Sequence, residues 1–433
     1  MASSTFRSTL SAALLLLLLL PLGLVQAAPT PGLLVANPDA TDIVPDSYIL
    51  KYKKGISHEV LQRSQQSARD LMQLSRRGAV LAAADADAPS SPRTRPPPFN
   101  GVHVRADHAT VRRISQDPAV EYVLYDTYVT NAGKAVRQTE AVASLARISQ
   151  AQPLEDKEGD YTYDSSAGEG VTVYIIDSGI YVDHPDFEGR AHHGYNAFDK
   201  NKLTIVPPSF QSNSSDDNGH GTNVAGIVGS ATFGVAKKAE LVAVKVLDAQ
   251  SWGTWSGIID GMQWAADDAK LRRRNVGRAI INMSIQSDRV DAMNDMLESI
   301  HHDGIPVVVC AGNYNKDAST VSPASAKSAI TVGAIDDQDN KADFSDYGED
   351  VDVFAPGVKV VSLSHNGGTS TYSGTSQAAP HVAGIAALLM SGEGLKDPDD
   401  IASRIRSMAE DTGAEVQENA SGTSNLIANN GFK

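Results

Sequence analysis

Three short stretches of the chain carry the residue types that perform acyl transfer when a fold brings them together. The stretch Ile-Ile-Asp177-Ser-Gly ends an apolar run, Asn-Gly-His220-Gly-Thr precedes a segment of small residues, and Ser-Gly-Thr-Ser376-Gln-Ala-Ala-Pro enters another. A serine hydroxyl is a poor nucleophile near neutral pH unless a neighbouring base takes its proton, and that base needs a third group to orient it. The pattern therefore predicts a nucleophile at Ser376, a general base at His220 and an orienting carboxylate at Asp177.

Each of these residues also has an ordinary structural explanation. An aspartate at the end of a strand often serves a turn, a histidine between glycines often lies in a loop, and a serine before a helix often caps it. A fourth stretch, Ala-Gly-Asn313, ends another apolar run, where an amide donor can join the Ser376 backbone N–H in binding an oxyanion. The conjunction of all four stretches, in the chain order Asp, His, Ser, predicts one catalytic site.

The second part of the chain alternates strand-like and helix-like segments. Five apolar runs predict strands: residues 171–176, 241–247, 279–285, 305–310 and 330–335. Helical stretches such as 256–270 and 290–302 separate them, which is typical of a parallel sheet covered on both faces. We expect a doubly wound α/β domain with its site at the carboxyl ends of the strands. Residues 378–390 are apolar on nearly every face, so they predict a buried helix with Ser376 at its positive N-terminus.

The first part of the chain predicts two further segments. Arg7, a leucine-rich run over residues 10–24 and small residues before a cleavage point at Ala27 indicate a signal peptide, residues 1–27. The run is shorter than the roughly 20 residues of a membrane span, so we expect a secreted, extracellular protein with no membrane partner.

Residues 28–135 form the second segment. Short strand and helix signals between about 46 and 130 predict a small α+β domain. Residues 82–98 are rich in Ala, Asp, Ser and Pro and indicate a flexible insertion, and residues 131–143 read as a polar connector.

Composition narrows the class of protein. The chain has 433 residues, 41% of them hydrophobic, which is typical of a folded globular protein, and its formal net charge of -15 argues against a nucleic-acid partner. Cys310 is the single cysteine, so no intramolecular disulfide can form. The sequons at Asn213 and Asn419 predict N-linked glycans, whereas the sequon at Asn282 lies in a predicted strand and is expected to be buried and unmodified.

Further motifs carry a family resemblance. They are Leu145-Ala-Arg-Ile148, His184-Pro-Asp-Phe-Glu-Gly189, Gly234-Val-Ala-Lys237, Val244-Lys-Val-Leu-Asp248, Ser322-Pro-Ala-Ser325 and Thr331-Val-Gly-Ala334. With these motifs, residues from about 144 to the C-terminus resemble the proteinase K branch of the subtilisin-like serine proteases, peptidase family S8. Residues 46–130 resemble the inhibitor I9-type propeptide of that family, which implies a ferredoxin-like fold.

The resemblance implies a secreted serine endopeptidase that hydrolyses peptide bonds in proteins through an acyl-enzyme. Its catalytic residues fall on Asp177, His220 and Ser376, its oxyanion asparagine falls on Asn313, and no cofactor is expected for catalysis.

The resemblance also implies a zymogen. Residues 28–135 would be a propeptide that assists folding, inhibits the enzyme intramolecularly and is removed autocatalytically near Ala135-Val136. Residues 136–433 would be the catalytic domain, and we expect a monomer whose partners are protein or peptide substrates and its own propeptide.

The family's substrate peptide adds as a strand between two extended segments, which match Ser251-Trp252-Gly253 and Ser284-Ile285-Gln286 in this chain. Four residues depart from the family pattern: Gln286 and Cys310 in the pocket for the residue before the scissile bond, Gln377 after the nucleophile, and Asn223. Altered substrate preference is one interpretation. The others are that Gln286 turns toward solvent and that Cys310 is a small buried hydrophobic residue.

Two further points stay open on the sequence. Asp352 matches a calcium-binding carboxylate of the family, with backbone carbonyls near Lys327 and Ala329 completing the shell, and such oxygen ligands suit a structural calcium ion. The altered residues also allow a catalytically weak homologue that acts as a peptide-binding protein, and the propeptide could act in trans as a protease inhibitor.

Overall fold

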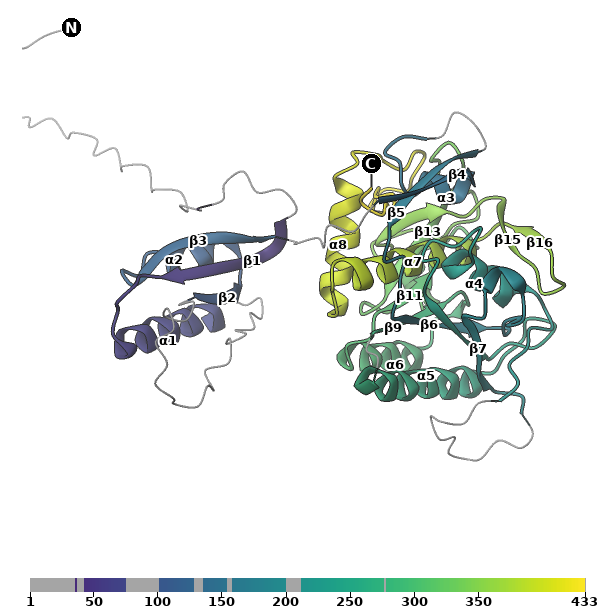
Figure 1. Ribbon diagram of the computed structural model, residues 1–433, viewed down its shortest axis with the longest axis horizontal. Helices are drawn as coiled ribbons and strands as arrows, with labels where there is room; N and C mark the ends of the chain where they lie inside the picture. Colours follow the sequence, from purple (N-terminus) through teal and green to yellow (C-terminus); the bar gives the residue numbers. More distant parts are fainter. Residues whose placement is uncertain are drawn as a thin grey trace, which may run out of the picture. The chain divides into compact units, whose positions relative to one another are not determined.

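The computed structural model describes residues 36, 43–74, 101–127, 135–153, 158–199, 212–275 and 278–432. They form two compact units, a small one centred on residues 48–124 and a large one that contains residues 43–47 and the described residues from 125 onward (Figure 1). The predicted signal peptide and the predicted insertion at residues 82–98 lie outside the described residues.

The small unit is a three-stranded sheet with two helices. Its strands are β1 (Ile43–Tyr52), β2 (Gly101–Arg105) and β3 (Val120–Thr127), in the order β2-β1-β3, and its helices are α1 (His58–Leu74) and α2 (His108–Ile114). Alternate residues of the strands, such as Leu50, Val104 and Val123, are buried. The predicted α+β arrangement of this segment is therefore present.

The large unit is built on a seven-stranded sheet in the order β14-β13-β11-β9-β6-β8-β7. All six pairings between neighbouring strands are parallel. The strands are β6 (Val171–Asp177), β7 (Ala191–Asn196), β8 (Glu240–Lys245), β9 (Arg278–Met283), β11 (Val307–Cys310), β13 (Ile330–Ile335) and β14 (Val353–Pro356). From β6 the chain goes to the edge strand β7, returns through β8, and then runs outward on the other side of β6 through β9, β11, β13 and β14, which confirms the predicted doubly wound α/β fold.

Helices cover both faces of this sheet (Figure 1). One hydrophobic cluster includes residues of α3 (Ala143–Arg147), α4 (His220–Gly229), α7 (Thr375–Gly392) and α8 (Pro398–Glu410). The cluster on the other face includes residues of α5 (Trp255–Asn275) and α6 (Asp291–His302). Two layers of apolar side chains therefore hold the sheet in place and fix where its strand ends lie.

Smaller paired elements complete the large unit. They are β4 (Ala135–Val142) with β5 (Glu158–Asp164), β10 (Ser287–Asp288) with β12 (Val321–Ser322), and β15 (Val360–Leu363) with β16 (Thr369–Tyr372), all antiparallel. The sequence predicted a polar connector over residues 131–143, but residues 135–142 form strand β4. Most of β4 is exposed or half-buried, so its sequence lacks the apolar alternation that marks a half-buried strand.

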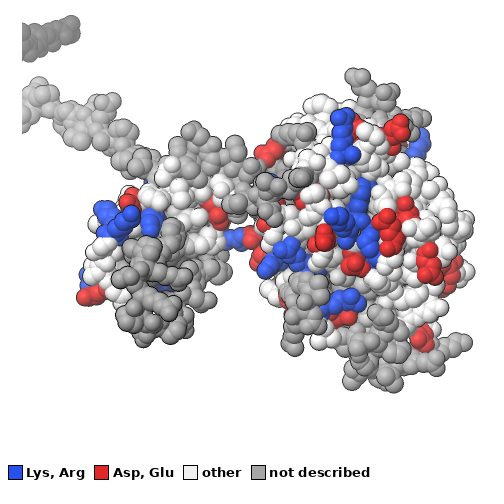
Figure 2. All heavy atoms as spheres, viewed as in Figure 1, with Lys and Arg blue, Asp and Glu red and all other residues white. Residues whose placement is uncertain are grey.

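Charged side chains of both signs are interspersed over the face of the large unit drawn in Figure 2. Among the described residues, no helix combines the length and the apolar character that crossing a membrane requires.

Candidate active site

Asp177 and His220 are brought together by the end of β6 and the start of α4. Asp177 is the last residue of β6 and is fully buried, and His220 is the first residue of α4. The preceding Gly219 has a φ of 107°, a left-handed conformation that favours glycine. His220 Nδ1 lies 2.8 and 3.0 Å from the two carboxylate oxygens of Asp177. This contact orients the ring and leaves Nε2 to act as the base.

Ser376 is the second residue of α7, and Pro380 in the same helix leaves its backbone carbonyl without the usual helical hydrogen bond. Proline has no backbone N–H, so the Ser376 carbonyl four residues earlier lacks its helical donor. Ser284, which directly follows β9, supplies that donor: its Oγ donates to the Ser376 carbonyl at 2.9 Å. In return, the Ser376 hydroxyl donates to the Ser284 carbonyl at 3.2 Å. This reciprocal pair attaches the N-terminus of α7 to the end of β9.

Asn313 lies three residues after β11, and its amide is oriented by Thr375. Its Oδ1 accepts from the Thr375 backbone N–H at 2.8 Å and from the Thr375 hydroxyl at 2.9 Å. Because the amide oxygen is held by the residue that precedes Ser376, the Nδ2 group is left as a donor beside the nucleophile. A free amide donor at this place is what the oxyanion role predicted for Asn313 requires.

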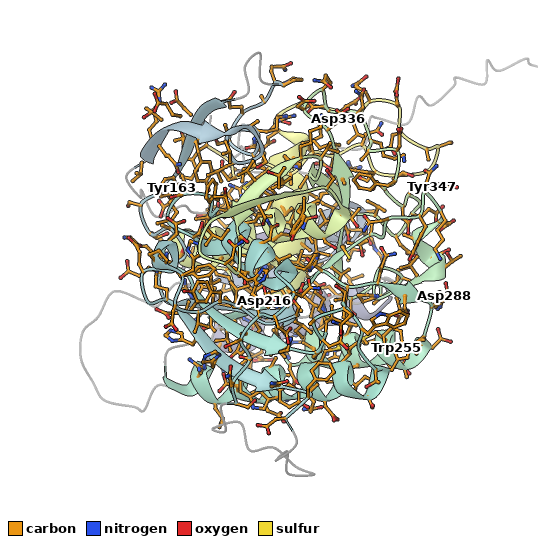
Figure 3. All side chains as sticks on the ribbon, turned by 90° about the vertical axis from the view of Figure 1, so that its right-hand side faces the viewer. Tyr163, Asp216, Trp255, Asp288, Asp336 and Tyr347 are labelled. Atoms are coloured by element: carbon orange, nitrogen blue, oxygen red, sulfur yellow. The ribbon has the colours of Figure 1, made fainter. Side chains whose placement is uncertain are left out.

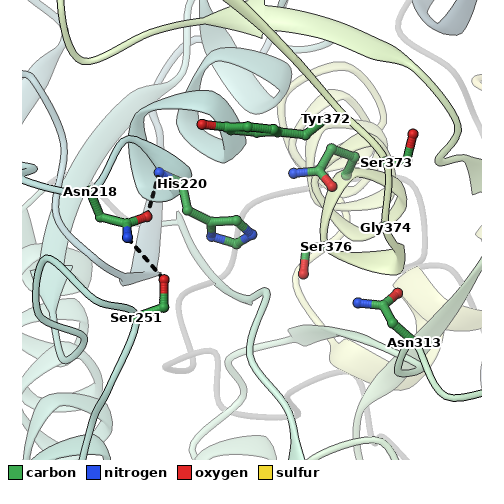
Figure 4. A pocket seen from close by; sticks show the side chains of 9 residues that line it. Asn218, His220, Ser251, Asn313, Tyr372, Ser373, Gly374 and Ser376 are labelled. Atoms are coloured by element: carbon green, nitrogen blue, oxygen red, sulfur yellow. Dashed lines mark hydrogen bonds between the residues drawn. The ribbon is translucent and has the colours of Figure 1, made fainter.

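These residues line one pocket of about 420 Å³ (Figure 4). His220 and Ser376 face one another across it, and Asn313 lies on the Ser376 side. The lining residues are Asn218, His220, Ser251, Asn313, Tyr372, Ser373, Gly374, Ser376 and Gln377. A base, a hydroxyl and an amide donor at one pocket are the groups that acyl transfer needs.

The charge around His220 tunes its basicity. Burial by itself lowers the pKa of His220, but the charge of Asp177 and its hydrogen bond outweigh burial, and the charge of Asp216 adds to them. The pKa of His220 is therefore raised above its ordinary value. Asp177 and Asp216 thus stabilise the imidazolium that forms when His220 takes a proton.

Asp216 is a functional residue that sequence reasoning missed. Its Oδ1 accepts from the backbone N–H groups of Asn218 at 3.0 Å and Gly219 at 2.8 Å, and its Oδ2 accepts from the N–H and hydroxyl of Thr222 at 2.9 and 2.6 Å. These bonds lower the pKa of Asp216 against the effect of burial. Asp216 therefore caps α4, beside which it is labelled in Figure 3.

Ser178 joins this cap to the strand that carries Asp177. The Ser178 hydroxyl donates to Asp216 Oδ1 at 2.9 Å and accepts from the Gly221 N–H at 3.0 Å. The aspartate three residues before the Gly-His-Gly sequence was the available signal, because an acidic residue before a helix often caps it.

A second polar link joins the helix of the base to the helix of the nucleophile. Gln377, which follows Ser376, donates from Nε2 to Asn223 Oδ1 at 3.4 Å, and Asn223 Nδ2 donates to the Ser370 hydroxyl at 3.0 Å. Asn223 is fully buried and Gln377 nearly so. Two of the four departures from the family pattern are therefore partners of one another, connecting α4, α7 and β16.

The predicted substrate residues lie in two groups around the site. Ser251 lines the pocket and accepts from Asn218 Nδ2 at 2.9 Å, and Trp252 is 75% exposed. A Cβ at Gly253 would lie 2.5 Å from the Val246 carbonyl oxygen, so this position requires glycine.

The second group comprises Ser284, Ile285, Gln286 and Cys310. The Cys310 thiol donates to the Ile285 carbonyl at 3.4 Å, and burial raises its pKa to about 12. Cys310 is therefore an inert buried thiol rather than a competing nucleophile. One interpretation of Gln286 was that its side chain turns toward solvent. The Oε1 atom of Gln286 is instead buried.

Asp352, the carboxylate expected to bind calcium, has two hydrogen-bond partners. Its Oδ2 accepts from the Thr331 N–H at 2.9 Å, and its Oδ1 accepts from the Arg406 guanidinium at 3.0 Å. The predicted calcium site, which also uses backbone carbonyls near Lys327 and Ala329, stays a prediction. In the part of the chain that the structure describes, no group of three or more His, Cys, Asp and Glu side chains is placed to hold a metal ion.

The sequons differ in their surroundings. Asn213 is exposed, whereas Asn419 donates from Nδ2 to the Ser424 carbonyl at 2.7 Å and to Asn425 Oδ1 at 2.9 Å. Asn282 is fully buried, as the sequence predicted.

The parallel sheet and the meeting of Asp177, His220 and Ser376 at one site are what is expected of a subtilisin-like serine protease. Comparison with known proteins agrees: residues 168–424 match the model of the subtilase family, Peptidase_S8. The chain belongs to the subtilase family, and it is a subtilisin-like serine protease.

Individual relatives cover most of the chain. Subtilisin-like protease 3 of Pseudogymnoascus destructans is 42% identical over 377 residues, 86% of this chain and 88% of the relative. The cuticle-degrading serine protease of Arthrobotrys oligospora is 39% identical over 409 residues, 92% of this chain and 93% of the relative. The crystal structure of a cold-adapted subtilisin-like serine proteinase matches with a TM-score of 0.58 and 34% identity, covering 67% of this chain and 99% of that chain.

Proposed function

We propose that this chain is a secreted serine endopeptidase of the proteinase K branch that cleaves proteins through an acyl-enzyme and is made as a zymogen. The observation that carries this proposal is the pocket in which His220, held by Asp177, faces Ser376 beside Asn313. The pocket lies at the carboxyl end of the sheet, where α/β folds assemble their sites.

Proton transfer begins with a small rotation. The Ser376 hydroxyl rests on the Ser284 carbonyl at 3.2 Å and must turn about its Cα–Cβ bond toward His220 Nε2 to give up its proton. A substrate strand that pairs with the segment at Ser284 would bring its own N–H group to that carbonyl. Substrate binding would then release the hydroxyl for attack.

Attack on the scissile carbonyl forms a tetrahedral oxyanion. The Nδ2 group of Asn313 and the N–H of Ser376, at the positive end of α7, are the donors that stabilise it. His220 then returns the proton to the leaving amine, and the same base activates the water that hydrolyses the acyl-enzyme. These steps use side chains, one backbone N–H group and water.

The substrate would lie as an extended strand between residues 251–253 and 284–286. Main-chain pairing gives affinity for any unfolded peptide, whereas the pockets between the two segments select side chains.

Residues 28–135 would act as the folding aid and intramolecular inhibitor, with autocatalytic cleavage near Ala135-Val136. The N-terminal residues 1–27 would direct secretion, and exposed Asn213 is the better acceptor for a glycan.

An active-site probe tests the proposal. A fluorophosphonate reacts with a serine only when a base and an oxyanion hole activate it, so the mature protein should be labelled and the Ser376→Ala variant should not. Ser373→Ala, which changes another serine of the same pocket, is the matched control and should keep its label. Absence of labelling in the mature protein would refute the proposal and favour a peptide-binding homologue.

A further inference from the structure

Two buried side-chain oxygens beside the end of β11 have no hydrogen-bond donor among the described residues. They are Oε1 of Gln286 and Oδ2 of Asp346. Both lie against Gly312, the residue before Asn313: a Cβ built on Gly312 would overlap Asp346 Oδ2 and lie 3.4 Å from Gln286 Oε1. An unpaired buried acceptor is unfavourable, so we expect each oxygen to have a hydrogen-bond donor. The two oxygens lie close together, on the same side of Gly312.

The other half of the Asp346 carboxylate is fully engaged. Asp346 is fully buried, and its Oδ1 accepts from the backbone N–H groups of Tyr314 and Lys316, both at 2.9 Å. These bonds hold the loop that follows Asn313. Replacement of Asp346 by asparagine can keep this oxygen in place, so the variant isolates what Oδ2 does.

Nearby lysines do not supply the missing donor. Lys316 Nζ pairs with Asp288 at 3.3 Å, and Lys341 Nζ donates to Asn315 Oδ1 and to the Ala342 and Ser345 carbonyls, each at 3.1 Å. Burial raises the pKa of Asp346 and outweighs the two N–H bonds and the positive charge of both lysines.

Gln286 carries a donor within reach. A half-turn of its terminal amide exchanges Oε1 and Nε2, so an N–H group then points at Asp346 Oδ2. The same half-turn places Oε1 on the opposite side of the amide. Gln286 as a whole is only half-buried, and it follows Ser284, whose carbonyl lies 3.2 Å from the Ser376 hydroxyl.

We propose that Gln286 and Asp346 form a specificity-determining pair: the Asp346 carboxylate holds the Gln286 N–H group and thereby presents Gln286 Oε1 to the substrate side chain before the scissile bond. This inference rests on the proposed protease function. A side chain that carries a hydrogen-bond donor is favoured there, and lysine most of all, because its ammonium group is also attracted by the Asp346 charge. Glutamate, which offers only acceptors, is disfavoured. Asp346 acts as a positioning residue through Gln286.

The opposite arrangement has the opposite preference. A proton on Asp346 Oδ2 would donate to Gln286 Oε1 and leave the Gln286 N–H group facing the substrate, which would favour glutamate. The side chain preferred before the scissile bond therefore distinguishes the two arrangements.

Three peptide substrates that differ only in the residue before the scissile bond test the proposal on the mature enzyme. Lysine, norleucine and glutamate have side chains of similar length, and kcat/KM is measured for each. We expect lysine to exceed norleucine about tenfold, the value of one good hydrogen bond, and norleucine to exceed glutamate. Gln286→Leu should reduce the advantage of lysine over norleucine to the part that the Asp346 charge supplies.

Asp346→Asn should reverse the preference. Its new amide can donate to Gln286 Oε1, which turns the Gln286 N–H group toward the substrate, so the ratio of lysine to glutamate should fall by at least about tenfold. Asp343→Asn removes the same charge from an exposed residue of the same loop and should keep the wild-type ratios.

The proposed pair would be refuted if the wild-type enzyme preferred the glutamate peptide. It would also be refuted if the ratios of kcat/KM between the peptides were unchanged in both Asp346→Asn and Gln286→Leu. Cleavage of the norleucine peptide in that case would leave the protease function standing. Failure to cleave all three peptides, together with failure of probe labelling, would refute the protease function instead.

Discussion

Replacement of Asp216 by asparagine tests whether this carboxylate holds the base-bearing helix in place. The carboxylate accepts five hydrogen bonds, from the Ser178 hydroxyl, the N–H groups of Asn218, Gly219 and Thr222, and the Thr222 hydroxyl. Asparagine keeps one acceptor oxygen and turns the other into an NH₂ donor. The substitution therefore changes charge and hydrogen bonding while leaving the volume of the side chain almost the same.

The expected loss in the free energy of unfolding follows from these five hydrogen bonds. The asparagine oxygen can stay with Ser178, Asn218 and Gly219, but its NH₂ group then faces the Thr222 N–H, which is left without an acceptor. A buried unsatisfied donor costs about 1–3 kcal/mol, and the loss of charge from the remaining bonds weakens them further. We expect the free energy of unfolding to fall by about 2–4 kcal/mol. Urea unfolding in a Ser376→Ala background, which prevents self-digestion, measures it.

The pH profile gives an independent readout. Asp216 helps to raise the pKa of His220, so removing its charge lowers that pKa. Since His220 must be neutral to act as a base, the acidic limb of kcat/KM should move to lower pH in Asp216→Asn. Asp183→Asn, a change at an exposed residue, should leave both measurements unchanged. A loss of stability below about 1 kcal/mol, or an acidic limb that does not move, would refute the reasoning.

Three further predictions follow from the site. Asn313→Ala should lower kcat by about 10²- to 10³-fold with little change in KM, because the donor acts on the oxyanion alone; an unchanged kcat in steady-state assays would remove Asn313 from the oxyanion hole. Gln377→Leu leaves the buried Asn223 Oδ1 atom without its donor and should lower the free energy of unfolding by about 1–3 kcal/mol, less in an Asn223→Ala background; equal losses in both backgrounds would show that the two side chains are not coupled. Chelation by EDTA should lower the melting temperature, because a calcium ion held at Asp352 would bind the folded state alone; an unchanged melting temperature would count against the predicted calcium site.

Much of the fold was predictable because its signals are local. The strand over residues 330–335 has the predicted bounds, since every residue of β13 is buried and the whole run is apolar. Strand β4 was missed because it is held by backbone pairing with β5 and buries few side chains. Its sequence therefore lacks the apolar alternation that would have predicted a strand. Helix α4 was missed as well, because its glycines are poor helix formers and only contacts from other segments hold it.

The sequence alone predicted the reacting groups of this protein: a serine, a histidine, an aspartate and an asparagine, each at the edge of an apolar segment that had to be buried. These residues could be predicted because the short stretches around them and their order along the chain can be read directly from the sequence. Tertiary structure decided how they are held, since Ser376 meets Ser284 across 92 residues and Asn313 meets Thr375 across 62. It also decided that Asp216 caps the helix of the base, that Gln377 faces Asn223, and that Asp346 lies against Gln286. Such partners leave no local pattern, because a buried polar side chain is satisfied by whichever donor or acceptor the packed sheet and helices bring beside it.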